Sequence, residues 1–162
     1  MNTLAGDFMR QNTWANLKLI DFCESLDPSA LDASVPGTYG RVRETLVHMV
    51  GSQERYVAWL TNSAPPAWQL NVADPWPGFP RLREVASRFG EELERLPQSA
   101  RDDWQTHSPY PDDDATTVAT VVFVQAYNHC ADHRSQIATT LSQAGIQPPE
   151  LDGWAWGEAK RR

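Results

Sequence analysis

The sequence predicts an all-α protein, and within that class a four-helix bundle. Four segments carry apolar residues at steps of three and four, which is the period of an amphipathic helix. Three stretches rich in proline and glycine separate these segments. The chain has 162 residues, of which 41% are hydrophobic, so it is long enough to bury one core. We therefore expect one domain over residues 1–162 in which the four helices pack together.

The first two helices are expected over residues 3–26 and 41–62. Apolar residues at helical spacing in the first segment are Leu4, Phe8, Trp14, Leu17, Leu19, Ile20, Phe22 and Leu26. The second segment carries one broad apolar stripe, formed by Leu46, Met49, Val50, Tyr56, Val57 and Leu60. The stretch between them, LDPSALDASVPGTYG, contains helix-breaking residues, so it is expected to be a connection.

The last two helices are expected over residues 81–96 and 115–144. Pro97 ends the third pattern, and Gly145 is expected to stop the fourth. Asp113 or Asp114 is expected to cap the start of the fourth helix. The run TTVATVVFV near this start would also fit a strand because it is rich in β-branched residues. Its continuity with a helical pattern that reaches Leu141 favours a helix.

The connection over residues 63–80 is long for a compact bundle, which indicates that it has a function or covers part of the molecule. It contains Trp68 and Trp76, which are weak candidates for the lining of a substrate entrance. An alternative is that these tryptophans simply pack against the bundle.

Charge and composition restrict the partners of the protein. Fourteen basic and 21 acidic residues give a net charge of −7, which argues against nucleic acid or an anionic membrane as a partner. No secretory signal is recognisable at the start, and no apolar run reaches the roughly 20 residues that a membrane-spanning helix needs. We therefore expect a soluble, cytoplasmic protein. In that setting Cys23 and Cys130 should be free, partly buried thiols.

The stretch NHCADHRSQI, residues 128–137, indicates a metal site. On a helix, His129 and His133 are about 40° apart around the axis, so both rings point the same way and can share one ion. His48, midway along the second helix, is the natural third ligand, and His107 in a proline-bounded loop is a weaker one. Pairs at this spacing also arise by chance, and the glutamate of an HExxH motif is absent.

Residues around the histidine pair carry further predictions. Asp132 and Gln136 are weak candidates for orienting the imidazole N–H bonds. Arg134 is expected to form a surface or inter-subunit ion pair rather than to bind a substrate carboxylate. Cys130 lies about 100° around the helix from His129, so we expect it to face away from the metal and to be neither ligand nor nucleophile.

Three stretches of the chain carry a family resemblance: TWANLKLIDFCESL, GTYGRVRETLVHMVGSQERYVAWL and NHCADHRSQIATTLSQAGIQPPELDGWAW. The chain resembles the DinB-like family of small metal-binding four-helix proteins. The metal triad of that family matches His48, His129 and His133. The resemblance implies a divalent ion, zinc or nickel, and together with the apolar bundle faces it implies a homodimer. It also implies activities like those of transferases and isomerases that use low-molecular-weight thiols such as bacillithiol, mycothiol or glutathione.

These observations lead to two functional hypotheses. In the first, the protein is an enzyme that acts on a small-molecule substrate. An ion held by three imidazoles keeps an open position, where it can hold a substrate thiol as thiolate for transfer to an electrophile. Hydrolysis by bound water is the nearest rival within this hypothesis. In the second, the protein is a non-catalytic module in which the metal is structural or the chain acts through dimerisation. A fourth ligand from the protein would favour the second hypothesis.

Overall fold

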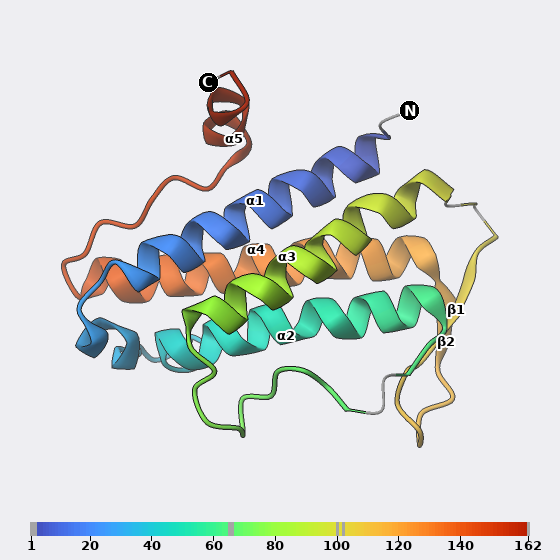
Figure 1. Ribbon diagram of the computed structural model, residues 1–162, viewed down its shortest axis with the longest axis horizontal. Coiled ribbons are helices and arrows are strands. Elements are labelled where there is room, and N and C mark those ends of the chain that lie inside the picture. The colour runs from blue at the N-terminus through green and yellow to red at the C-terminus, as the bar shows by residue number, and fades with distance from the viewer. Residues whose placement is uncertain (1–2, 65–66, 100, 102, 162) are drawn as a thin grey trace.

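Four long helices form the body of the protein in a computed structural model that describes residues 3–64, 67–99, 101 and 103–161 (Figure 1). The predicted four-helix bundle is confirmed. Its helices are α1 (Leu4–Glu24), α2 (Val42–Thr61), α3 (Phe79–Arg95) and α4 (Ala119–Gln143). Shorter elements are η1 (Pro28–Asp32), η2 (Leu96–Ser99), β1 (Gln105–His107), β2 (Thr116–Val118) and α5 (Gly153–Ala159). No described helix combines the length and the apolar character that crossing a bilayer requires.

The helices are not arranged in simple up-and-down order. Helices α1 and α2 each pack against both α3 and α4, so α1 and α2 occupy opposite corners of the bundle. Figure 1 shows α2 and α3 running in the same direction, with α1 and α4 running in the opposite one. The connection from α2 to α3 must therefore return along the whole bundle, which explains its length. Among the described residues, α2 and α4 are direct neighbours, and these two helices carry the predicted metal ligands.

The core lies where the four helices meet. Its fully buried members from all four helices include Leu19, Ile20, Leu46, Met49, Leu82, Ile137 and Leu141. Burying one such side chain stabilises the fold by about 1.5–3 kcal/mol relative to leaving it exposed. Helices α1 and α3 approach closely at Gly90, where an added Cβ atom would lie 2.5 Å from Cγ2 of Thr13.

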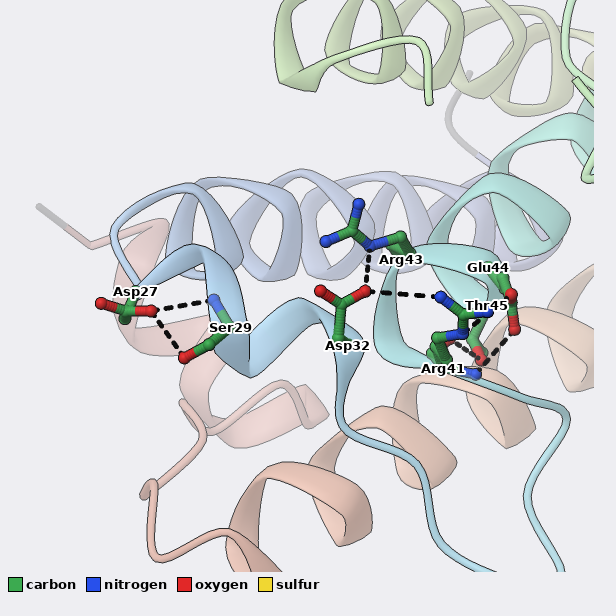
Figure 2. Close-up of polar contacts among 7 residues, drawn as sticks. All are labelled: Asp27, Ser29, Asp32, Arg41, Arg43, Glu44 and Thr45. Atoms are coloured by element: carbon green, nitrogen blue, oxygen red, sulfur yellow. Dashed lines mark hydrogen bonds and ion pairs between the residues drawn. The ribbon is translucent and has the colours of Figure 1, made fainter. Parts of the chain in front are cut away.

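A cluster of polar contacts ties η1 to the start of α2 (Figure 2). The Arg43 Nε atom lies 2.9 Å from Oδ1 of Asp32, and the Arg41 guanidinium lies 3.6 Å from the same oxygen. The backbone N–H of Arg41 donates to Oε2 of Glu44 at 3.0 Å, which satisfies one donor that the helix start leaves free. Exposed ion pairs add little stability, but these contacts fix both ends of the segment that carries Tyr39.

The start of α4 differs from the prediction. Residues Thr116–Val118 form β2, which pairs antiparallel with β1, Gln105–His107. The β-branched run is therefore a strand for three residues, and the helix begins only at Ala119. Neither Asp113 nor Asp114 caps the helix, because both lie in the turn between the two strands. The end of α4 is as predicted, with Gly145 just beyond it at φ +78°.

Candidate metal centre

The three predicted histidines meet between α2 and α4. The Nε2 atom of His129 lies 3.0 Å from Nε2 of His48 and 3.2 Å from Nε2 of His133. The ligand atoms that the three rings offer all lie within 4.8 Å of one another. Within the described residues, no further His, Cys, Asp or Glu side chain joins this group. The structure thus brings together the two histidines of one helix and the third from its neighbour.

Two of the three separations between the ring nitrogens, both measured from His129, fit a shared cation. A ring nitrogen offers either one hydrogen or one lone pair, so Nε2 of His129 cannot make good hydrogen bonds to both His48 and His133. A cation about 2.0–2.1 Å from each nitrogen would satisfy all three. Bond angles of about 90–110° then place neighbouring nitrogens roughly 2.8–3.4 Å apart. The two observed separations fall within this range.

Gln136 determines which nitrogen of His133 faces the cluster. The backbone N–H of Tyr39 donates to Oε1 of Gln136 at 3.0 Å, and this backbone group can only donate. The same oxygen lies 3.0 Å from Nδ1 of His133, so Nδ1 must carry the hydrogen. The lone pair of His133 is then on Nε2, which points toward His129. This is the contact that the sequence predicted for Gln136.

Tyr39 covers one side of the cluster. Its ring stacks on His48 with centroids 4.0 Å apart and planes 16° apart, and it meets the edge of His133 at 5.3 Å. The sequence prediction missed this residue because it lies in a connection and not on a helix. The available signal was an aromatic side chain in the glycine-flanked stretch GTYG, nine residues before His48.

Burial keeps two of the rings neutral. It lowers the pKa of His48 to about 4, with smaller contributions from the charges of His133 and Arg55. It lowers the pKa of His129 to about 3, with His133, His48 and Arg55 adding to the effect. Both rings are therefore unprotonated at neutral pH, which is the form that binds metal. Among described residues, Nδ1 of His129 is buried without a hydrogen-bond partner.

A cavity of about 350 Å³ opens beside the cluster. His48 and His129 line it together with Tyr39, Val47, Ser52, Arg55, Tyr56, Trp59, Leu70, Asn71, Val72 and Tyr110. One wall comes from the α2–α3 connection, which approaches α2 at Gly51. A Cβ atom at that position would lie 3.0 Å from the carbonyl oxygen of Leu70, so glycine allows the wall to sit this close.

The two tryptophans of this connection are not among the lining residues. Trp68 contacts two lining residues: its ring centre lies 5.7 Å from that of Tyr110 and 5.0 Å from the Arg55 guanidinium. Trp76 packs against the core and meets Phe79 edge-on at 5.3 Å. The connection does cover the site, but it does so through its aliphatic and amide side chains between the tryptophans.

Two other predicted residues lie outside the cluster. Asp132 is exposed, and no hydrogen bond joins it to an imidazole within the described part of the chain. His107 lies on β1 and is exposed, with its backbone N–H donating to Oδ1 of Asn62 at 2.8 Å. Neither residue belongs to the group that could hold a metal.

The prediction for Arg134 is wrong. Its side chain is only 6% exposed, and Nη1 donates to the side-chain oxygens of Asn12 and Asn16, each at 2.6 Å. The guanidinium turns inward because α1 presents two amide acceptors to it, and within the described residues it forms no ion pair. Cys130 is buried beside this network and faces away from the cluster, as predicted. Burial raises the pKa of its thiol.

Comparison with known proteins places the chain in a family. The model of the DinB family matches residues 1–161. The chain belongs to the DinB family. A DinB-like protein from Bacillus cereus is similar over 87% of this chain and 91% of that chain, with a TM-score of 0.64 and 14% identity.

A second solved structure shares the DinB fold. YfiT from Bacillus subtilis is described as a probable metal-dependent hydrolase with an unusual four-helix bundle topology. It covers 88% of this chain and 89% of its own, with a TM-score of 0.54 and 19% identity. No curated protein matches this DinB sequence significantly. The family resemblance predicted from the helical and histidine-containing stretches is thus confirmed.

Proposed function

We propose that this DinB family protein is a metal-dependent enzyme whose divalent ion is held by His48, His129 and His133. The observation that carries the proposal is the meeting of three Nε2 atoms beside a cavity. Three neutral nitrogen donors suit zinc or nickel, because imidazole is a common ligand of both ions. Gln136 supports the site by holding the His133 ring in the orientation that a ligand needs.

The surroundings of the cluster favour catalysis over a structural role. Structural zinc sites are almost always closed by four protein ligands, whereas catalytic sites keep one position open. Here the described residues offer three side chains that could act as ligands. His48 and His129 both line the cavity, so the side of the cluster without a protein ligand can face a bound molecule.

The lining residues suggest which nucleophile the site would use. No Asp or Glu lies among the described lining residues, so the cavity offers no carboxylate as a general base. A divalent ion in the site would favour the deprotonated form of a bound thiol or water. Of the two, a thiol depends less on a separate base, because its ordinary pKa of about 8.5 is far below the value of about 15.7 for water. We infer that the enzyme transfers a low-molecular-weight thiol to an electrophile. The thiol loses its proton to solvent as it binds, its sulfur forms a bond to the electrophilic carbon, and the displaced group leaves as an anion. The apolar wall at Val47, Trp59 and Leu70 limits access of water to this step.

Hydrolysis is the second candidate, and the similarity to YfiT favours it. In that reaction water would occupy the position of the thiol, and the leaving group would need a proton. Tyr56 lines the cavity, and its hydroxyl is the lining group that would donate a hydrogen bond to that leaving group. The two reactions therefore share a site and differ in the bound nucleophile.

Paired assays on the metal-loaded protein test this proposal. Glutathione or cysteine with 1-chloro-2,4-dinitrobenzene reports thiol transfer, and 4-nitrophenyl acetate reports hydrolysis. We expect thiol transfer that falls by about a hundredfold or more in His133→Ala, while the fold measured by circular dichroism survives. His107→Ala is the matched control and should keep full activity. Ester hydrolysis alone would favour the second candidate, and inactivity toward both substrates would favour a non-catalytic module.

A further inference from the structure

The charge of the cavity is opposite to that of the chain. The protein carries a net charge of −7, but the described lining residues include neither Asp nor Glu. One lining residue, Arg55, carries a permanent positive charge. The cavity is thus a local cationic site in an acidic protein, and this arrangement favours an anionic ligand over a neutral or cationic one.

Arg55 is held in place without a carboxylate partner. Its Nη1 atom donates to the carbonyl oxygen of Gly51 at 2.7 Å, and its guanidinium lies 5.0 Å from the Trp68 ring centre. Within the described part of the chain, Arg55 forms no ion pair. A guanidinium has five N–H donors, so most of its hydrogen-bonding capacity is free for a ligand. The stacking on Trp68 limits its movement before a ligand binds.

Arg55 also lies at a defined position relative to the histidine cluster. It follows His48 by seven residues on α2, which is almost two full turns, so both side chains project from the same face. Their Cα atoms are roughly 10 Å apart along the helix. Both line the same cavity, and Leu70 and Val72 of the connection form part of its apolar wall.

We propose that Arg55 binds a carboxylate of the substrate, and that the substrate spans from this anchor to the histidine cluster. A carboxylate fits this anchor because its two oxygens can pair with the fork of N–H donors on one guanidinium. The middle of the substrate is apolar, in keeping with the wall that it faces. The inference rests on the proposed function, since it assigns the substrate class of the same site. The proposed substrate class is small carboxylic acids, or electrophiles that carry a carboxylate group.

Binding of simple probes to the metal-free protein tests this assignment. We would titrate 3-phenylpropanoate and its uncharged analogue 3-phenylpropanamide into the full chain and follow NMR shifts of the indole and backbone N–H groups. The carboxylate should bind about tenfold more tightly than the amide. Arg55→Gln should abolish this preference, and Arg55→Lys should retain part of it. Arg88→Gln is the matched control, because Arg88 is exposed on α3 and does not line the cavity.

Several outcomes would overturn the assignment. These are equal binding of the two probes, no binding of either probe, and a preference that survives in Arg55→Gln. Melting curves of each variant show whether the fold is intact, and the Lys variant tests the charge if the Gln variant is unstable. Because no ion is present, the result does not depend on metal binding. Failure of the proposed function would appear instead in the metal-loaded assays, so the two failures are distinguishable.

Discussion

The Oε1 atom of Gln136 lies 3.0 Å from Nδ1 of His133 and holds that ring with Nε2 toward the other two imidazoles. The same oxygen accepts the backbone N–H of Tyr39. The Gln136 side chain therefore links the connection that carries Tyr39 to the His133 ring. Gln136 thus acts on the orientation of the His133 ring, because its oxygen contacts Nδ1 and leaves Nε2 facing the other imidazoles.

Replacing this amide should weaken metal binding without unfolding the protein. In Gln136→Leu the His133 ring loses its acceptor and becomes free to rotate or to change tautomer, so affinity for zinc should fall about 10–100-fold. A competition titration against a chromophoric chelator measures the change. Gln143→Leu, an exposed substitution at the end of the same helix, is the control. Unchanged affinity in Gln136→Leu would show that this amide does not orient the ring.

Gly51 is expected to be required for the cavity wall. In Gly51→Ala the new methyl group would lie 3.0 Å from the Leu70 carbonyl oxygen and 3.1 Å from Nη1 of Arg55, so the wall must shift. We expect the free energy of unfolding to fall by about 1–3 kcal/mol, measured by urea denaturation. Gly157→Ala has open space around it and should be neutral or slightly stabilising. Equal stability of Gly51→Ala and the wild type would mean that the wall moves freely.

The buried network around Arg134 is predicted to stabilise the bundle and not the metal site. Asn16→Ala removes one of the two oxygens that accept from the buried guanidinium. The free energy of unfolding should fall by about 1.5–3 kcal/mol, because the lost hydrogen bond involves a charged donor. Zinc affinity should stay within about twofold. Asn128→Ala, exposed on α4, is the matched control, and a similar loss in both variants would contradict the prediction.

Stability of the metal-free protein should depend on pH through the cluster. Burial lowers the pKa of His48 to about 4 and of His129 to about 3, so the unfolded chain binds more protons below about pH 6.5. The free energy of unfolding is then greatest above this pH and decreases as the pH falls toward about 4. Thermal melts across this range should show the decrease, and a variant with both His48→Gln and His129→Gln should show a shallower one. If stability depends equally on pH in the wild type and in the double variant, His48 and His129 are not the cause of that dependence.

The sequence predicts the helices and the His129–His133 pair because both depend on local spacing. Apolar residues at steps of three and four mark the long helices, and two histidines four apart must share a helix face. His48 follows from its position midway along a second helix. Its meeting with His129 requires α2 and α4 to be neighbours, which spacing alone does not determine. The assignment of residues 1–162 to one domain, metal binding by His48, His129 and His133, the homodimer and the choice of metal stay predictions.

Other features depend on contacts that cross between elements. Arg134 follows His133 on α4, but its burial is set by two asparagines on α1, more than a hundred residues earlier. The position of Tyr39 depends on how its connection returns to the bundle. Thr116–Val118 has a mixed local preference, and pairing with Gln105–His107 decides it in favour of a strand. In each case the deciding partner lies far away in the sequence.

The content of bound metal tests the central claim most directly. The purified protein is dialysed against zinc or nickel, freed of loose ions, and analysed for metal by elemental mass spectrometry. We predict one ion per chain in the wild type and in His107→Ala, and almost none in His48→Ala, His129→Ala or His133→Ala. A wild-type protein that retains no ion, or three histidine variants that still retain one, would contradict the account.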